Sequence, residues 1–380
     1  MLSPLWWLPF TLLGGVCFAA PAIAPLVTPF GTMPDGARIE QVTLENRLGM
    51  RLSVIDYGAT LTAVEVPDRH GKRVNVVLGL PDLPAYRASK RRFGTVGRYA
   101  GRIRDMRYTL DGRAVDLGSS QPATGYERRI WQRRDFQDAS STGATYTLVS
   151  PAGDQGFPGT LTVEVTYRLL RERNEVRIEY TATTDAPTVL NLTNHSYFNL
   201  AGAGTAGLGT HRFDIAADRY VALQDKLPTG ALPSVAGTPL DFRQPRSLFT
   251  GMGAQRALLG KPPGYDHGLV FAKPLGAYAR VARIDESVSG RRLEIWTSAP
   301  SVQLFTGRSF DGRERGAEGR AYLPNDGFAF EPQHLADSPN HPHFPSTALY
   351  PGQLFKALTS LRFGVVQSPR HKKNGLTNNQ

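Results

Sequence analysis

The sequence has almost no cysteine. Its 380 residues include only Cys17, which lies in an apolar N-terminal segment. If that segment is removed, the remaining chain has no thiol, which excludes disulfides, cysteine-ligated metals and a cysteine nucleophile. The sequence also lacks a glycine-rich phosphate loop. It has no Gly-x-Ser-x-Gly elbow, which argues against a serine hydrolase even though Ser196 lies beside a histidine.

Charged side chains are missing from the first 34 residues, and Asp35 is the first charged side chain. The apolar run Leu5–Ala24 ends in small residues, so we predict a secretory signal peptide over residues 1–24. An uncleaved membrane anchor is the alternative, because no lysine or arginine precedes the run. Either interpretation places the body of the protein outside the cytoplasm: secreted or periplasmic, or anchored to the membrane and facing outward.

No long stretch repeats apolar residues with the 3.6-residue period of a helix. Short runs of alternating polarity, separated by turn residues, predict antiparallel strands instead. Two short helices are expected, over Pro81–Ser89 and Ser247–Leu259, and a loop over Pro25–Asp35. The chain is therefore predicted to be all-β, a large antiparallel β-sandwich over residues 25–366, followed by a disordered basic tail over 367–380. Among the predicted strands are Met50–Val66, which forms a hairpin with Val74–Leu80, and Thr160–Arg171, Asn174–Thr184, Arg291–Ser298, Ser301–Thr306 and Gly327–Glu331.

Basic residues outnumber acidic ones, with a formal net charge of +11. Many of the arginines stand at predicted turns, as in Lys90-Arg91-Arg92 and Arg128-Arg129. No helix-turn-helix, zinc-finger or RNA-recognition pattern accompanies them, so we expect a basic solvated surface and no nucleic-acid partner. A metal site is not expected either, because His341-Pro-His343 has no third ligand at a suitable spacing.

Residues 191–200 read Asn-Leu-Thr-Asn-His-Ser-Tyr-Phe-Asn-Leu and follow a strand-like run. Amides and hydroxyls can bind the hydroxyls of a sugar, aromatic rings can cover its apolar face, and His195 can move a proton near neutral pH. The segment is therefore a candidate sugar site that includes Ser196 and Tyr197. A strand end with turn-forming asparagines and a structural histidine is the alternative.

Other segments carry matching groups. Glu331 ends the apolar run Phe328-Ala329-Phe330, where partial desolvation would raise its pKa toward that of a useful base. An exposed glutamate at a strand end is the alternative. Asp266 could accept hydrogen bonds from two sugar hydroxyls, although an Asp-x-Gly turn residue fits equally well. Three further candidates are Arg98 and Arg102 as donors to sugar oxygens, for which surface arginines are the alternative, and Gln303, which an outward-facing side chain explains as well.

Together these segments resemble the aldose 1-epimerase (galactose mutarotase) family. The similar segments appear in the family's order and span most of Pro25 to Val366. The resemblance implies a galactose-mutarotase-type β-sandwich and an isomerase that interconverts the anomers of free hexoses without metal or cofactor. It also implies that Glu331 is the base, that His195 is the acid, and that Arg102, Asp266, Gln303 and Tyr197 surround the sugar. The similar segments are Gly97–Ile103, Gly125–Trp131, Gly156-Phe157-Pro158-Gly159, Asn191–Leu200, Leu240-Asp241-Phe242-Arg243, Gly264–His267, Val302–Gly307 and Glu331–Ser346.

Two departures from the family pattern stand out. Gly101, in the substrate-binding loop, replaces the usual asparagine, and a Leu-His-Gly-Gly segment before Gly125 is missing its histidine. We expect weaker binding or a different preferred sugar, with Ser120 or Gln121 as a replacement donor. Two alternatives stay open: a non-catalytic carbohydrate-binding protein on the same scaffold, and an epimerase for phosphorylated or acidic sugars, which the many arginines suggest.

Overall fold

The computed structural model describes residues 23–118, 125–250, 259 and 263–366. Several predictions lie outside these ranges: most of the signal peptide with Cys17, the basic tail, and the replacement donors Ser120 and Gln121. Most of the short helix expected over Ser247–Leu259 does too. In the part of the chain that is described, no helix is long and apolar enough to cross a membrane.

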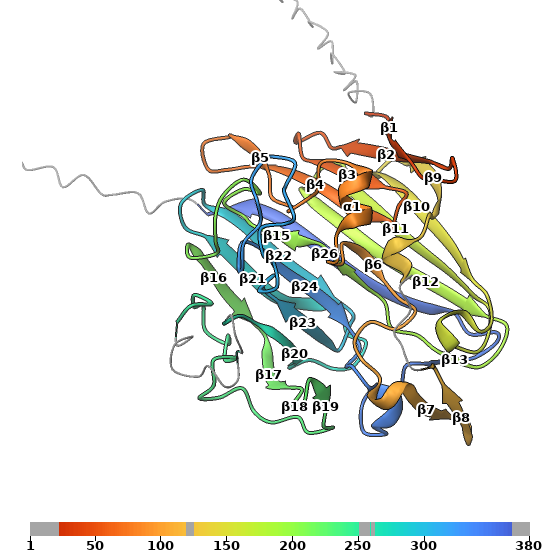
Figure 1. Cartoon of the computed structure of the whole chain (residues 1–380). Coiled ribbons are helices and arrows are strands. Elements are labelled where there is room, and N and C mark those ends of the chain that lie inside the picture. The colour runs from red at the N-terminus through yellow and green to blue at the C-terminus, as the bar shows by residue number, and fades with distance from the viewer. Residues whose placement is uncertain (1–22, 119–124, 251–258, 260–262, 367–380) are drawn as a thin grey trace, which may run out of the picture.

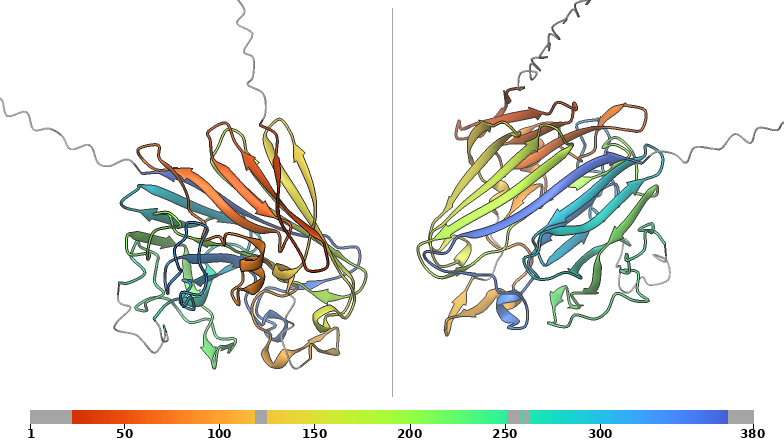
Figure 2. Two further views of the ribbon diagram at one scale, coloured as in Figure 1. Left: turned by 45° about the horizontal axis from the view of Figure 1, so that its top comes forward. Right: turned by 180° about the vertical axis from the view of Figure 1, so that it is seen from behind.

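The largest layer is an eight-stranded sheet, seen from behind in Figure 2. Every neighbouring pair in it is antiparallel. Its strands, in spatial order, are β16 (His211–Ile215), β21 (Ala279–Glu286), β22 (Arg291–Thr297), β26 (Phe355–Val365), β12 (Glu175–Thr184), β11 (Leu161–Leu170), β10 (Ser141–Ser150) and β9 (Gln132–Gln137).

Two five-stranded antiparallel sheets cover one face of this layer (Figures 1 and 2). One contains β1 (Leu26–Thr32), β2 (Arg38–Glu45), β3 (Arg51–Ile55), β4 (Thr60–Pro67) and β5 (Arg73–Asn75). The other contains β15 (Tyr197–Phe198), β24 (Phe328–Gln333), β23 (Ser301–Phe305), β20 (Asp266–Phe271) and β17 (Ala217–Tyr220) in that order.

Smaller elements complete the fold. Two-stranded pairs are formed by β14 (Thr193–His195) with β6 (Gly94–Val96), β13 (Thr188–Val189) with β25 (Ala348–Leu349), β18 (Leu223–Gln224) with β19 (Leu227–Pro228), and β7 (Arg107–Leu110) with β8 (Arg113–Asp116). The described helices are α1 (Leu83–Ala88) and the 3-10 turns η1 (Arg104–Met106), η2 (Tyr126–Arg128), η3 (Asp154–Gly156) and η4 (Ser338–Asn340).

The core lies between the sheets because the strands alternate in polarity. Along β11, every second residue from Leu161 to Leu169 is buried, and the residues between them are only partly covered. The buried side chains form one apolar cluster with residues of both five-stranded sheets, such as Val54 and Phe330. Burying this much apolar surface is the main driving force of folding. The predicted all-β sandwich is confirmed.

The N-terminal part differs from the prediction in two places. The loop expected over Pro25–Asp35 is wrong, because Leu26–Thr32 forms the edge strand β1, with a register shift between Pro29 and Gly31. Proline is tolerated on an edge strand at such an irregularity. The run Met50–Val66 is two strands, since Gly58 turns the chain between them at φ 74°. The short helix expected over Pro81–Ser89 is present as α1, where Asp82 caps the N-terminus by accepting from the Ala85 amide.

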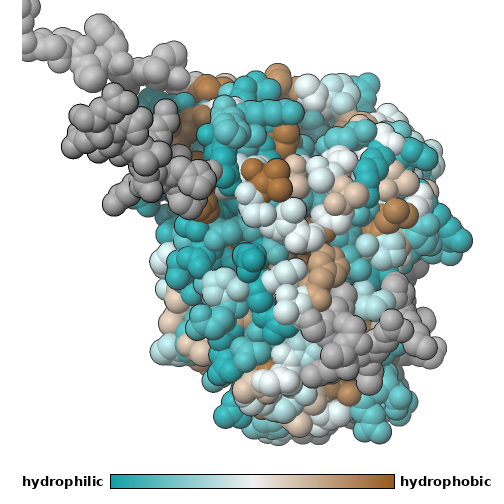
Figure 3. Space-filling view, turned by 90° about the vertical axis from the view of Figure 1, so that its left-hand side faces the viewer, coloured by the Kyte–Doolittle hydropathy of each residue, from teal (hydrophilic) through white to brown (hydrophobic). Residues whose placement is uncertain are grey.

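One face of the molecule is mainly hydrophilic. Figure 3 shows a face on which hydrophilic residues predominate and hydrophobic ones are scattered. Isolated apolar residues are normal on a folded surface and indicate no interface by themselves.

Candidate active site

The site is built on the outer face of the β15-β24-β23-β20-β17 sheet. In this sheet Glu331 on β24 lies directly opposite Gln303 on β23, and Gln303 lies opposite Gly268 on β20. Directly opposed residues point to the same face, as do residues two apart along a strand. Glu331, Gln303 and Asp266 therefore share one face, while Leu304 and Phe330 point into the core.

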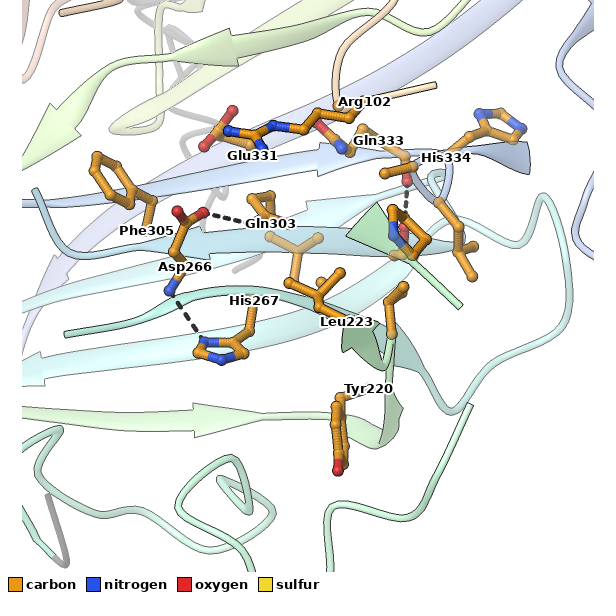
Figure 4. Close-up of a pocket in the computed structure, with 18 of the residues that line it drawn as sticks. Arg102, Tyr220, Leu223, Asp266, His267, Gln303, Phe305, Glu331, Gln333 and His334 are labelled. Carbon is orange, nitrogen blue, oxygen red and sulfur yellow. Dashed lines mark hydrogen bonds between the residues drawn. The ribbon is translucent and has the colours of Figure 1, made fainter. Parts of the chain in front are cut away.

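A cavity of about 630 Å³ opens over this face. That volume is within the usual range for small-molecule sites, about 300–1,000 Å³. Figure 4 shows Asp266, Gln303 and Glu331 on neighbouring strands, with Arg102 coming from a loop above them. The lining also includes Arg92, Gly101, His195, Lys226, Arg308 and Gln333.

His195 comes from a different part of the chain and meets Glu331 in this cavity. It ends β14, where it pairs with Gly94 of β6. Its Nε2 lies 3.5 Å from Oε1 of Glu331, and the two side chains are only 13% and 7% exposed. Aromatic rings fix the imidazole from the sides, with the Tyr197 ring centroid at 5.0 Å and that of Phe305 at 5.9 Å.

Burial shifts the pKa of both groups toward their neutral forms. It raises the pKa of Glu331 well above the usual value, and the negative charge of Asp266 raises it further, while Arg92 acts in the opposite direction. Burial lowers the pKa of His195 to about 4. At pH values between these two pKa values the pair holds one proton. The neutral pair of carboxylic acid and imidazole and the ion pair of carboxylate and imidazolium therefore differ by a single proton transfer.

Asp266 faces the cavity as a hydrogen-bond acceptor. The Gln303 amide donates to its Oδ1 at 2.7 Å, and the Arg308 guanidinium lies 3.9 Å from its Oδ2. The side chain is 47% exposed, so the carboxylate can still accept from a ligand. The sequence of this segment fits a turn residue equally well, but Asp266 is the first residue of β20. Gln303 points into the cavity and holds the carboxylate in place.

The loop before η1 contributes Gly101 and Arg102, both of which line the cavity. Gly101 has φ 87°, and a Cβ atom there would lie 2.8 Å from Cβ of Ala336. The local backbone therefore favours glycine at this position. The sequence motif predicted both cavity-lining positions.

Arg98 does not reach the cavity, so the prediction that it binds the sugar is wrong. Its side chain is fully buried. The guanidinium donates to the carbonyls of Pro158, Gly159 and Ser150 and to the Ser150 hydroxyl at 2.7–3.0 Å. It joins three segments of backbone and is a structural residue.

Most of the 191–200 motif also serves the structure. The Asn191 amide donates to the carbonyls of Ala100 and His334, and the Asn199 amide donates to three backbone carbonyls. Tyr197 is buried among aromatic rings, where it packs against His195 instead of lining the cavity. Ser196 is buried as well and does not line it. The expected sugar contacts of Tyr197 and Ser196 are therefore corrected, and His195 is the motif residue in the cavity.

Several lining residues were missed from the sequence. Arg92 belongs to the Lys90-Arg91-Arg92 run, which is typical of a solvated turn, and Lys226 in the β18–β19 hairpin belongs to no recognisable motif. Gln333 and His334 lie in the Glu331–Ser346 segment, where strand alternation from Glu331 would have placed Gln333 on the same face. Loop residues such as Arg92 give no such periodic signal.

No group of three or more metal-ligating side chains occurs in the described part of the chain. His341 pairs instead with Asp337 at 3.1 Å, and the ring of His343 hydrogen-bonds the Gly230 carbonyl at 2.8 Å. Both histidines thus have structural partners.

Comparisons with a family model and with individual proteins indicate the same family. The family model described as aldose 1-epimerase matches residues 40–362. A galactose mutarotase from Rattus norvegicus is 36% identical, with 89% of this chain and 98% of the relative covered. An aldose 1-epimerase from Escherichia coli strain K12 is 37% identical, with 87% and 96% covered.

Solved structures agree with the sequence comparison. An aldose epimerase homologue from C. elegans superposes with a TM-score of 0.76 at 29% identity, covering 86% of this chain and 98% of that one. A galactose 1-epimerase from Lactobacillus acidophilus NCFM gives a TM-score of 0.77 at 26% identity, covering 91% and 100%.

Proposed function

Because the chain belongs to the aldose 1-epimerase family and is an isomerase that interconverts the anomers of aldoses, we propose that Glu331 and His195 are its proton-transfer pair. The observation that carries this assignment is the 3.5 Å approach of the two buried side chains in the main cavity. A carboxylate and an imidazole that lie this close together can reach the anomeric hydroxyl and the ring oxygen of the same sugar.

The reaction then proceeds in two mirrored halves. Glu331 takes the proton of the anomeric hydroxyl, the bond between C1 and the ring oxygen breaks, and His195 gives its proton to the ring oxygen. Rotation about the C1–C2 bond of the bound aldehyde presents the other carbonyl face. The former ring oxygen attacks that face and returns its proton to His195, while Glu331 protonates O1.

Ring opening converts the charged pair into the neutral pair, which burial favours. Because the resting pair is already neutral, the proton must first pass from Glu331 to His195, and ring opening recovers the cost of that transfer. Each positioned acid or base contributes about 10²–10⁴-fold in rate.

For the substrate, we propose free hexoses. Asp266 and Gln303 form a fixed acceptor–donor pair at 2.7 Å that suits vicinal hydroxyls. Relatives named galactose mutarotase support a hexose. Competition by hexose phosphates or uronic acids at low concentration would instead favour the acidic-sugar alternative.

Polarimetry of fresh α-glucose or α-galactose tests the assignment. Glu331→Gln and His195→Asn should each abolish the acceleration, while His70→Asn, which changes an exposed loop histidine, should not. Full activity in either site variant would refute the roles proposed. Sugar binding by the wild type without acceleration would identify a carbohydrate-binding protein.

We also propose that the protein acts outside the cytoplasm. The support is the composition of residues 1–34, which contain a long apolar run and no charge. N-terminal sequencing of the mature protein tests this, and an intact N-terminus on a cytoplasmic protein would contradict it.

A further inference from the structure

Arg92 lies at the catalytic corner of the cavity. It is in the segment between α1 and β6, two residues before Gly94, which is the β-sheet partner of His195. It lines the main cavity together with His195 and Glu331. Its side chain is 41% exposed, so part of it remains accessible to a ligand.

A buried carboxylate positions this arginine. Arg92 Nε lies 3.5 Å from Oε1 of Glu127, whose side chain is only 6% exposed. Glu127 belongs to η2, and it lines a small hollow together with Arg92 and Gly101, both of which also line the main cavity. Since Gly101 brings no side chain to this corner, Arg92 is the cationic donor that reaches it from the β6 side.

We infer that Arg92 is a further substrate-contacting residue, which donates a charged hydrogen bond to the sugar oxygens beside the anomeric carbon and stabilises the carboxylate of Glu331. This inference rests on the proposed roles of Glu331 and His195. An arginine suits the task because it stays protonated at every working pH and offers several donors in a fixed geometry.

The charged groups around Glu331 and His195 determine how the loss of Arg92 changes the pKa values of this pair. Facing Glu331 and His195 are Arg92, Asp266 on β20 and Arg102, with the phenols of Tyr180 and Tyr197 behind them. Burial raises the pKa of both phenols, so they are neutral at working pH. The positive charge of Arg92 lowers the pKa of Glu331 and also that of His195. Removing the charge should therefore move both limbs of the pH profile upward.

The experiment compares Arg92→Gln, Arg92→Lys and Lys90→Gln in the full chain, by kcat and KM across pH and by thermal unfolding. Lys90→Gln is the matched control, because Lys90 is exposed, lies two residues away and does not line the cavity. Arg92→Gln should lower kcat/KM about ten- to a hundredfold, the effect of losing one charged hydrogen bond. Both of its pH limbs should move to higher pH, whereas Arg92→Lys should keep the limbs in place.

Two results would overturn the inference. One is an Arg92→Gln enzyme with unchanged kcat/KM and an unshifted pH profile. The other is a loss of kcat/KM that is equal at every pH, is accompanied by a lower Tm, and is just as large in Arg92→Lys. Should Arg92→Gln fail to fold, Glu127→Gln provides the second test. It removes the charge that offsets Arg92, so both limbs should move to lower pH, and unmoved limbs would reject the proposal. Failure of the proposed function is a separate outcome, since that appears as activity in Glu331→Gln.

Discussion

A substitution at Arg98 distinguishes a structural arginine from one that binds the substrate. The substitution Arg98→Lys keeps the charge but replaces a planar donor array with a single ammonium group. That group cannot reach the carbonyls of Pro158, Gly159 and Ser150 and the Ser150 hydroxyl together. The variant leaves a buried charge poorly paired and buried acceptors without donors.

The magnitude follows from the burial. Disrupting a buried charged network costs about 3–5 kcal/mol of folding free energy. For a domain spanning at least the matched residues 40–362, with an unfolding entropy of about 2.1 cal/mol/K per residue, each kcal/mol lowers Tm by about 1.5 °C. Arg98→Lys should therefore lower Tm by about 4–7 °C while KM stays near the wild-type value.

Differential scanning calorimetry and polarimetric kinetics on the same preparation of Arg98→Lys measure the Tm and the KM that test this prediction. Arg113→Lys is the matched control, because Arg113 lies exposed on β8 and should tolerate the change. A variant with wild-type Tm and a raised KM would show that Arg98 contacts the sugar and would refute the structural assignment.

Three further predictions concern the site. Gly101→Asn should lower Tm and raise KM instead of restoring a contact, because φ is 87° and the new Cβ meets Ala336; recovery on adding Ala336→Gly would support this, and a lower KM in the single variant would contradict it. Asp266→Asn should raise KM about ten- to a hundredfold through loss of a charged acceptor. It should also move the alkaline limb of the pH profile to lower pH, because Asp266 raises the pKa of Glu331; an unmoved limb would count against that coupling. Burial raises the folded-state pKa of Glu331, so its stabilising contribution is complete below the unfolded-state pKa and is lost as pH rises through the folded one. The Tm advantage of Glu331→Gln should therefore grow with pH over that window, and a constant difference would refute the linkage.

Much of the sandwich could be predicted because alternation is a local signal. The predicted strand Thr160–Arg171 corresponds to β11, and Asn174–Thr184 to β12, each within a residue or two of the observed bounds. The edge strand β1 was missed because it contains Pro29 and Gly31, which are residue types typical of loops. Its pairing with β2 is a tertiary fact that local sequence does not show.

The site was predictable where a strand or a family motif carried it. Glu331, Gln303 and Asp266 fall on one sheet face, and the resemblance identified all three. Arg98 and Tyr197 were misassigned because both side chains turn inward, which a motif of loops and short strands does not reveal. Arg92 reaches the cavity from a non-periodic segment, so only the three-dimensional structure shows its position.

The central claim is that Glu331 and His195 act as one proton-transfer unit. The most direct test is a double-variant cycle in which kcat is measured for Glu331→Gln, His195→Asn and the two combined. Groups that act as a unit give strongly non-additive losses. The account predicts that each single variant loses at least about 10²-fold and that the double variant is no slower than the worse single one. Losses that multiply in the double variant, or a single variant with wild-type kcat, would contradict it.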